Sequence, residues 1–274
     1  MAILIDLEHL SNKLLAIVQN TRNLLDKGYY SNQAKFIHQY NRSTIIDAIN
    51  KCKGFPVIAE LKFSTPVTSL HHEPTFDSAK NRLAEYARSS ICGISILTEP
   101  DFFSGSLEYL DYATATVETE IPILMKDFII DPLQIDCAKN FGASSILLIS
   151  SILTKDNLQK LINYAFKQNL EVLLEVNNED ELNKALESSV NLIGINNRNL
   201  STMKVTLDTT ENLLKLVNKK GKKIISLSGI NNINDVIKMK KAGADGILVG
   251  SSLMSSSDSK SLIKEFTTVS DVFT

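Results

Sequence analysis

Eight short apolar runs alternate along this chain with segments of helical period. The runs occupy residues 56–61, 92–97, 121–125, 145–149, 171–174, 191–195, 223–226 and 246–249. Strands that are apolar on both faces, and are each followed by a helix, predict a parallel sheet covered by helices. Eight such units in roughly 220 residues favour a single closed (β/α)8 TIM barrel over an open doubly wound sheet, and no Gly-x-Gly-x-x-Gly turn follows the first run.

Side chains that begin helices stand between several of these runs. Ser, Thr, Asp and Asn accept hydrogen bonds from the first free N–H groups of a helix, and proline fits the first turn. The predicted caps are Asp131 before Pro132, Thr154, Asn178 with Glu181, and Asp208 with Glu211. Each cap follows an apolar run, which supports the alternation of strand and helix.

The first part of the chain is helical rather than stranded. Five apolar residues recur there at helical spacing and predict a first helix. They are Leu7, Leu10, Leu14, Ile17 and Val18. A second helix is predicted over residues 43–51. We therefore predict one TIM-barrel domain over residues 1–274, in which residues 1–52 are an N-terminal helical extension and residues 53–274 are the barrel.

The charge balance limits the partners that this chain can bind. A formal net charge of −2 and a pI near 6.1 give no broad basic field for nucleic acid, so local cations must meet any anionic ligand. No apolar run is long enough to cross a membrane. Asp6 and Glu8 interrupt the first apolar stretch, which does not resemble a signal peptide. These features predict a cytoplasmic protein without nucleic-acid or membrane partners.

Cysteine and histidine spacing argue against disulfides and metal. Cys52, Cys92 and Cys137 are odd in number, widely separated and set in apolar or helical surroundings. This pattern predicts reduced, buried thiols. The four histidines include no helical i, i+4 pair and none stands beside a cysteine at ligand spacing, so no metal site is expected.

Polar side chains end four of the eight runs. They are Glu60 and Lys62 after the first, Lys126 after the third, Glu175 after the fifth, and Asn196 and Arg198 after the sixth. The carboxyl ends of barrel strands meet at one mouth, which is where the chemistry of such barrels occurs. Any one of the charged residues taken alone would be a rim salt bridge. Five charges on four strands, flanked by apolar sequence, instead favour a site in which burial adjusts the pKa values for proton transfer.

The last two runs end in pairs of small residues. These pairs are Ser228-Gly229 and Gly250-Ser251, and each opens a short helical segment. Loops after the seventh and eighth strands of a barrel often hold a phosphate with backbone N–H groups. One such pair would be an ordinary turn, but two pairs at the two expected places predict a phosphate-ester substrate.

Aromatic side chains and a long loop complete the predicted mouth. Phe103 and Phe128 follow the second and third runs and are candidates to line an apolar pocket for a ring, although core packing is the alternative. Residues 63–76 are polar and interrupted by prolines, so they form either a mobile lid or an ordinary surface loop.

Six segments resemble the successive strand-end motifs of the indole-3-glycerol phosphate synthase family. They are VIAELKFSTP, ILTEPDFFSGSLEYL, ILMKDFIIDPLQI, LLEVNNEDEL, IGINNRNL and ILVGSSLM. KDFIIDP and GINNRNL are specific to that family rather than to barrels in general. The resemblance implies a monomeric lyase of tryptophan biosynthesis that needs no cofactor. It would convert 1-(2-carboxyphenylamino)-1-deoxyribulose 5-phosphate to indole-3-glycerol phosphate with loss of carbon dioxide and water.

The resemblance also implies roles for individual catalytic residues. Lys126 would be the main general acid, and Glu175 would assist the later loss of hydroxyl by proton transfer. Lys62 is a second candidate for the final acid step, and this choice is left open. Glu60 and Asn196 would orient the substrate and hold the catalytic lysines.

The same resemblance assigns the substrate-binding residues. Arg198 would lie near the substrate, and Ser228 would contact it. The family grips the phosphate at positions that correspond here to Lys62, Gly229, Gly250 and Ser251. Thr65 stands where the family usually has the serine of a Ser-Pro pair, and it keeps a hydroxyl.

Two departures from the family pattern leave alternatives open. The turn after the seventh strand is normally Glu-Ser-Gly, but here it is Leu227-Ser228-Gly229. The missing carboxylate is either an absent helper or the sign of an impaired barrel that binds a phosphorylated ligand without efficient turnover. The loop over residues 65–70 also lacks the cation and glycine of the family loop. A further alternative, an isomerase of a related anthranilate ribotide, is disfavoured by KDFIIDP and GINNRNL.

Overall fold

The computed structural model describes residues 11–32, 38, 41–65, 68–69 and 73–269. Within these residues, eight parallel strands close into a barrel in the order β1-β10-β9-β8-β7-β6-β5-β4. The strands are β1 (Val57–Leu61), β4 (Gly93–Leu97), β5 (Ile123–Lys126), β6 (Ser145–Ile149), β7 (Glu171–Val176), β8 (Leu192–Asn196), β9 (Lys223–Leu227) and β10 (Gly246–Val249). Each predicted run overlaps one of these strands, so the predicted TIM barrel is confirmed.

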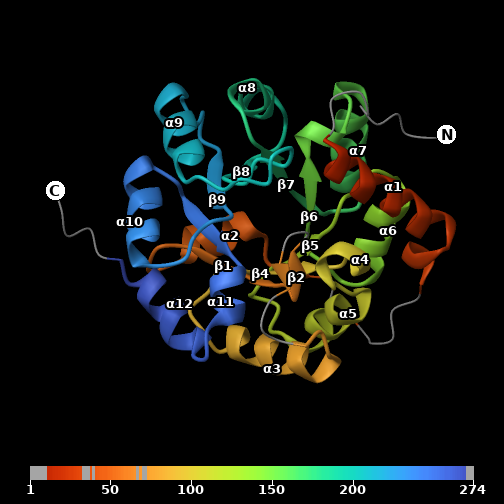
Figure 1. Cartoon of the computed structure of the whole chain (residues 1–274), viewed down its shortest axis with the longest axis horizontal. Coiled ribbons are helices and arrows are strands. Elements are labelled where there is room, and N and C mark those ends of the chain that lie inside the picture. The colour runs from red at the N-terminus through yellow and green to blue at the C-terminus, as the bar shows by residue number, and fades with distance from the viewer. Residues whose placement is uncertain (1–10, 33–37, 39–40, 66–67, 70–72, 270–274) are drawn as a thin grey trace.

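Helices lie around the outside of the strands (Figure 1). The helices that follow the strands are α3 (Phe76–Ala87), α5 (Leu107–Thr116), α6 (Pro132–Asn140), α7 (Lys155–Lys167), α8 (Glu179–Glu187), α9 (Asp208–Leu216), α10 (Ile233–Ala242) and α12 (Ser259–Thr267). Shorter pieces are α4 (Pro100–Phe103), α11 (Ser251–Ser255), the 3-10 turns η1 (Tyr29–Ser31) and η2 (Ser150–Ile152), and the antiparallel pair β2 (Ser64–Thr65) and β3 (Thr68–Ser69). No helix of the described residues has the length and apolar character needed to cross a membrane.

Three of the four predicted helix caps are confirmed. Asp131, Thr154 and Asn178 each accept a backbone N–H at the start of the next helix. The prediction for Asp208 is wrong, because Asp208 is the first residue of α9 and the cap position is Leu207, which has no side-chain acceptor. The Asp208 carboxylate instead lies 2.5 Å from Nζ of Lys238 on α10.

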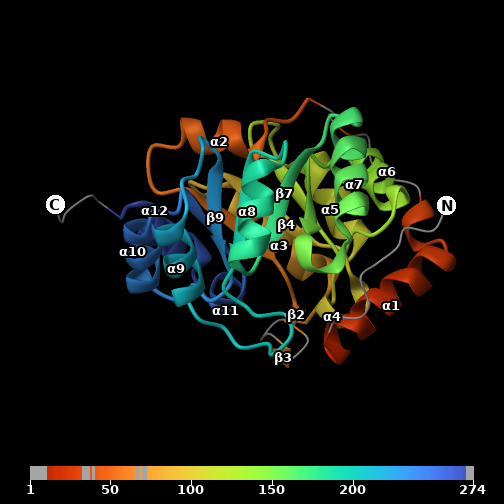
Figure 2. The ribbon, with the colours of Figure 1, turned by 90° about the horizontal axis from the view of Figure 1, so that it is seen from above.

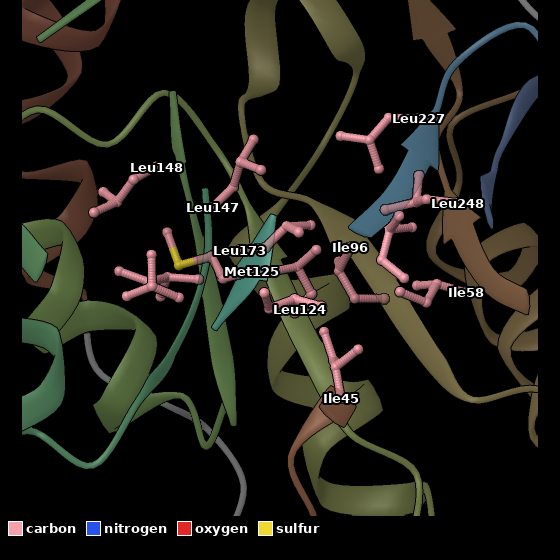
Figure 3. Packing of buried hydrophobic residues seen from close by; sticks show 14 of the residues in the cluster. Ile45, Ile58, Ile96, Leu124, Met125, Leu147, Leu148, Leu173, Leu227 and Leu248 are labelled. Carbon is pink, nitrogen blue, oxygen red and sulfur yellow. The ribbon is translucent and has the colours of Figure 1, made fainter. Parts of the chain in front are cut away.

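Apolar side chains from the strands fill the interior of the barrel. Figure 3 shows Ile58, Ile96, Leu173 and Leu248 gathered with others in one cluster, and each of these four is at most 4% exposed. Burying a side chain of this size contributes roughly 1.5–3 kcal/mol relative to leaving it in water. The closed strand order is therefore stabilised from within, and the strand ends are held in fixed positions around the mouth.

Helix α2 (Ile45–Lys51) covers the amino ends of the strands. Ile45 is fully buried and packs near Gly93, where β4 begins. The carboxylate of Glu171, where β7 begins, accepts the N–H groups of Ile45 at 2.7 Å and Ile46 at 3.2 Å. Figure 2 shows α2 on one side of the barrel, and β2, β3 and α4 on the opposite side. The second predicted helix therefore seals the end of the barrel that lies away from the mouth.

Helix α1 (Asn12–Asp26) lies at the mouth. Its cap residue Ser11 donates to the carbonyl of Leu200 after β8, and Asn20 donates to Glu99 after β4 at 3.0 Å. Leu14, with Ile17 and Val18, is buried as predicted. Leu7 and Leu10 lie outside the described residues, and the division of the chain at residue 52 stays a prediction.

The three cysteines are free thiols in the structure. Cys92 and Cys137 are buried, as predicted. The prediction is wrong for Cys52, which is only partly buried because it forms the C-cap of α2 and faces an open cavity.

Arg42 fixes the chain that leads into α2. Its guanidinium donates to four carbonyls at and beyond the end of α5, those of Thr114, Val117, Glu118 and Ile121. A cation at a helix C-terminus is favourable, and the planar fork of arginine serves several acceptors at once.

We expect Arg42→Ala to lower the free energy of unfolding by about 2–3 kcal/mol, because it leaves several carbonyls without their donor. Arg42→Lys should recover less than half of this loss, since an ammonium cannot span all four acceptors. Urea unfolding measures both. The control is Arg88→Ala, at an exposed position, with an expected change within about 0.5 kcal/mol. Equal losses for Arg88→Ala and Arg42→Ala would contradict the anchoring role.

Candidate functional site

All thirteen predicted site residues line one cavity of about 270 Å³ at the carboxyl ends of the strands. They are Glu60, Lys62, Thr65, Phe103, Lys126, Phe128, Glu175, Asn196, Arg198, Ser228, Gly229, Gly250 and Ser251. The rule that barrel strands converge at one mouth predicts this grouping for the residues at the strand ends, and Thr65 joins them through the family resemblance. Their individual catalytic and binding roles stay predictions.

Glu60 lies between two lysines. Its Oε1 is 2.7 Å from Nζ of Lys62 and its Oε2 is 3.7 Å from Nζ of Lys126, and the residue is only 3% exposed. Burial alone would raise the pKa of Glu60, but the attraction of Lys62 and Lys126 outweighs it and holds that pKa below the usual value. Oε2 has no hydrogen-bond donor among the described residues. An ionised, buried oxygen is thus available to a polar hydrogen of a ligand.

Gly250 allows this charged group to pack against the end of β10. A Cβ at this position would lie 2.5 Å from Oε1 of Glu60 and 3.1 Å from Nζ of Lys62. A Cβ here would displace the Glu60 carboxylate from its contact with Lys62, so glycine lets the end of β10 approach the pair without disturbing it. The Gly250-Ser251 turn is consequently placed directly beside Lys62.

Glu175 is the second carboxylate of the cavity, and its surroundings differ from those of Glu60. Nδ2 of Asn196 donates to its Oε1 at 2.8 Å. Burial raises the pKa of Glu175, and this effect exceeds the opposing effects of Lys126 and the Asn196 hydrogen bond. Two carboxylates whose pKa values are pushed apart are suited to different roles. Glu60 can remain an anion, while Glu175 can gain and lose a proton closer to neutral pH.

One wall of the cavity is apolar. The rings of Phe103 and Phe128 lie 5.7 Å apart between centroids and are tilted by 34°. Phe103 is held in place by Glu99, whose buried carboxylate accepts the N–H groups at the start of α4. Leu14 and Ile17 of α1 also line the cavity, and the sequence had indicated them only as helix-packing residues. A planar ring could therefore lie against this wall.

Asp127 lines the cavity but was not among the predicted site residues. It is buried, and it accepts hydrogen bonds from the hydroxyls of Thr98 at 2.5 Å and Tyr30 at 3.1 Å. Its Oδ1 also accepts the N–H of Phe128 at 2.7 Å. Burial is the main reason that its pKa rises to about 6. Because Asp127 directly follows Lys126, this network fixes the turn that presents Lys126 to the cavity.

The Ser228-Gly229 turn has a left-handed backbone at both residues, with φ of +66° and +85°. For a serine this conformation costs on the order of 1 kcal/mol. Asn197, which is 1% exposed, donates from Nδ2 to the carbonyl of Ser228 at 3.0 Å and to Oγ of Ser226 at 2.9 Å. Its Oδ1 accepts from Thr210. Asn197 thus holds the turn in its strained form.

Neighbouring loops at the mouth are joined in a similar way. Nδ2 of Asn177, after β7, donates to the carbonyl of Asn196 at the end of β8 and to that of Arg198 just beyond it. Oγ of Ser252, after β10, donates to the carbonyl of Ile230 after β9. Each link runs from a side chain of one loop to the backbone of the next. The loop over residues 63–76, predicted to be either a lid or an ordinary surface loop, stays a prediction, because residues 66–67 and 70–72 lie outside the described residues.

The fold and cavity define a TIM barrel with a site for acid-base chemistry beside turns of the phosphate-binding kind. The model of the indole-3-glycerol phosphate synthase family matches residues 7–266. Indole-3-glycerol phosphate synthases of Staphylococcus aureus strains JH1 and Newman are 41% and 42% identical to the chain over 245 residues, covering 88% of it and 92% of each relative. The chain belongs to the indole-3-glycerol phosphate synthase family.

Solved structures of other enzymes share the architecture. A thiamine phosphate pyrophosphorylase from Pyrococcus furiosus and a 3-hexulose-6-phosphate synthase each give a TM-score of 0.55 and cover 77% of this chain. The matches cover 93% and 97% of those proteins at 16% and 17% identity. At this level of identity the likeness concerns the fold alone.

Asn197→Ala should weaken binding of indole-3-glycerol phosphate about tenfold, because the Ser228 turn loses the donor that holds it. Adding Ser228→Gly to this variant should restore most of the affinity, since glycine adopts the left-handed conformation without steric cost. Calorimetric titration of the single and double variants measures the effect.

Thr210→Val is the matched control, because it removes a partner of Asn197 without touching the Ser228 carbonyl. It should lower stability while leaving the affinity close to that of the wild type. If glycine at position 228 fails to restore binding, Asn197 acts only through general stability.

Proposed function

We propose that this chain acts as an indole-3-glycerol phosphate synthase, a carboxy-lyase of tryptophan biosynthesis. The substrate is 1-(2-carboxyphenylamino)-1-deoxyribulose 5-phosphate, and the products are indole-3-glycerol phosphate, carbon dioxide and water. The observation that carries the proposal is the grouping of Glu60, Lys62 and Lys126 with Glu175 and Asn196 in one cavity of a chain that belongs to this family.

The cavity offers a complement to each part of that substrate. The turns at Ser228-Gly229 and Gly250-Ser251, with Lys62 beside the second, suit the phosphate. Phe103 and Phe128 form an apolar wall for the aromatic ring. Arg198 also lines the cavity and adds positive charge for the carboxylate or the phosphate. Thr65 supplies a hydroxyl at the rim.

Ring closure requires a proton on the ketone oxygen. As the ring carbon that bears the carboxylate attacks the ketone carbon, Lys126 donates a proton to the oxygen and leaves a hydroxyl group. Loss of carbon dioxide then restores the aromatic ring. Glu60, ionised beside Lys126, stabilises the ammonium form before transfer, and its Oε2, which faces Lys126 at 3.7 Å without a hydrogen bond, can accept the substrate's N–H or hydroxyl.

Dehydration completes the indole. The hydroxyl leaves as water after protonation by a lysine, which is either Lys62, still holding its proton, or Lys126 after it has taken up a new proton from solvent; Glu60 contacts both. Glu175 takes up the proton that is released as the ring double bond forms. Its raised pKa supports this exchange, since a carboxylate with an ordinary pKa would be a weaker base near neutral pH. Asn196 keeps the Glu175 carboxylate in place.

We further propose that the enzyme works as a monomer in the cytoplasm, on a small phosphorylated substrate and without nucleic acid. The net charge of −2 supports the expectation that the enzyme does not bind nucleic acid. Residues 1–52 would act as an extension of the barrel, with α1 adding to the mouth and α2 closing the far end.

The decisive experiment is steady-state conversion of the substrate, followed by the fluorescence of the indole product. Turnover of about one per second or faster is expected for the wild type.

Lys126→Ala should lower kcat by about 10²–10⁴-fold with little change in urea stability, because a general acid is lost. Lys264→Ala, at an exposed position of α12, is the control. Tight binding without product in the wild type would favour the impaired barrel, and an unchanged kcat in Lys126→Ala would remove that lysine from the mechanism.

Leu227 occupies the place of the usual family glutamate. It is 1% exposed and in register with Asn196 on β8. Gly194 leaves it room, since a Cβ there would lie 2.6 Å from Cδ1 of Leu227. A carboxylate at this position would face Asn196 and lie in the same cavity as Glu60 and Glu175. The leucine therefore keeps the cavity less negative and favours anionic substrates.

Leu227→Glu should raise KM about tenfold, because the added charge repels the substrate's carboxylate and phosphate. Leu227→Gln, which has the same shape without the charge, should raise KM less. Initial rates at several substrate concentrations separate KM from kcat. A marked increase in kcat for Leu227→Glu would show instead that the leucine is a lost catalytic group.

A further inference from the structure

One hydroxyl in the wall of the barrel has no hydrogen-bond partner among the described residues. It belongs to Ser95, which lies in the middle of β4 and is 0% exposed. Burying a hydroxyl in this way is unfavourable, because the hydrogen bonds that it made to water are not replaced. Native proteins rarely retain such a group in their interior unless it has a use.

Ser95 lies on the strand between the two members of an ion pair. Strand β4 is hydrogen-bonded to β1 on one side and to β5 on the other. Ser95 is in register with Glu60 of β1 and with Leu124 of β5, two residues before Lys126. Side chains in register on parallel strands share a face, as do those two residues apart on one strand. Because Glu60 and Lys126 line the mouth cavity, Ser95 also points into the barrel.

The ion pair above Ser95 contains an acceptor that is not used either. Oε2 of Glu60 faces Nζ of Lys126 at 3.7 Å, beyond hydrogen-bond distance, and receives no donor from the described residues. Neighbouring strands lie about 4.8 Å apart, which is within the combined reach of a serine and a glutamate side chain. A carboxylate oxygen can accept two hydrogen bonds, so Oε2 can serve Ser95 and a substrate N–H together. An unused donor and an unused acceptor therefore lie on adjacent strands at the same level.

The charges around Glu60 change during the proposed reaction. Lys62 and Lys126 contact its carboxylate, while Arg198 and Glu175 act on it from a greater distance. When Lys126 gives its proton to the substrate ketone, the oxygen that faces this lysine loses the attraction of the ammonium group. A buried carboxylate in that position tends to take up a proton unless another group donates to it. The proton-transfer step thus creates a need for a neutral donor beside Oε2.

We propose that Ser95 is a positioning residue that acts through Glu60: its hydroxyl donates to Oε2 once Lys126 has given up its proton. This inference rests on the proposed function, because proton donation by Lys126 is the event that the hydroxyl supports. A serine hydroxyl rotates to suit its partner, so no movement of the backbone is required. The new hydrogen bond keeps Glu60 ionised beside the neutral amine and lowers the free energy of the state that follows proton transfer.

Ser95→Ala should lower kcat about tenfold and leave KM close to the wild-type value, because the hydroxyl acts only as the proton moves. The same substitution should leave the stability unchanged or raise it, since a methyl group replaces a hydroxyl that has no partner in the resting enzyme. Initial rates and urea unfolding measure the two effects. A residue with a purely structural role would lose activity and stability together.

Ser145→Ala is the matched control. Ser145 lies on β6 and is equally buried, but its hydroxyl donates to the carbonyl of Ile123 at 3.4 Å. We expect this variant to keep the wild-type kcat and to lose a little stability. If Ser95→Ala loses as much stability as Ser145→Ala, its hydroxyl already has a partner in the resting enzyme and the proposal is wrong.

A second measurement needs no substrate. The rate at which acetic anhydride acetylates Lys126 at one fixed pH, followed by peptide mass, reports the fraction of this lysine that is a neutral amine. Ser95→Ala should slow the reaction about tenfold, because Glu60 beside a neutral Lys126 has lost its donor. Ser145→Ala should not slow it, and Lys264 on the exposed face of α12 is the internal reference.

The two measurements separate this inference from the proposed function. A wild-type rate of Lys126 acetylation in Ser95→Ala would overturn the role of the hydroxyl, and so would an unchanged kcat in that variant when the wild type is active. Absence of product from the wild type would instead reject the proposed function. Slower acetylation in Ser95→Ala would then still show that Ser95 acts on the Glu60 and Lys126 pair.

Discussion

Glu60 is buried as an anion, and the residues around it at the mouth of the barrel offset the free-energy cost of removing its charge from water. An isolated carboxylate in such a place would take up a proton rather than remain charged. Lys62 and Lys126 prevent this by lying on either side of it. Both lysines reach one carboxylate because β1 and β5 end at the mouth, and glycine at position 250 lets the end of β10 lie against the Glu60 and Lys62 side chains. The two salt bridges of Glu60 thereby hold the Lys62 and Lys126 side chains in place and stabilise their protonated forms.

The two N-terminal helices support the ends of the barrel in different ways. Helix α2 is tied to the amino ends of β4 and β7 through apolar packing and the Glu171 carboxylate. Helix α1 reaches the mouth, where Leu14 and Ile17 become part of the cavity wall. The extension therefore contributes both to folding and to the shape of the site. It also brings Tyr30 to Asp127, next to Lys126.

The barrel and most of the residues that line the mouth cavity could be predicted because the signals are local, whereas Thr65 was assigned only through the resemblance to the family. Apolar runs mark strands, and the carboxyl end of each strand is known once its run is located. Asp127 could not be assigned in this way, since its partners Tyr30 and Thr98 are 97 and 29 residues away. Asp208 was assigned wrongly because a distant lysine on α10 competes for its carboxylate. The exposure of Cys52 likewise depends on packing between elements that are distant in sequence.

The links between the mouth loops have a consequence for how this site can change. Asn177, Asn197 and Ser252 each donate to a backbone carbonyl at the mouth end of the neighbouring unit, and Asn197 donates in addition to the side-chain Oγ of Ser226 on β9. Every residue type supplies the same carbonyl, so the side chains that point into the cavity are free to vary while the loops keep their spacing. A replacement such as leucine at position 227 then alters the chemistry of the cavity without disturbing its frame. The mouth is a scaffold on which new substrate preferences can arise by single substitutions.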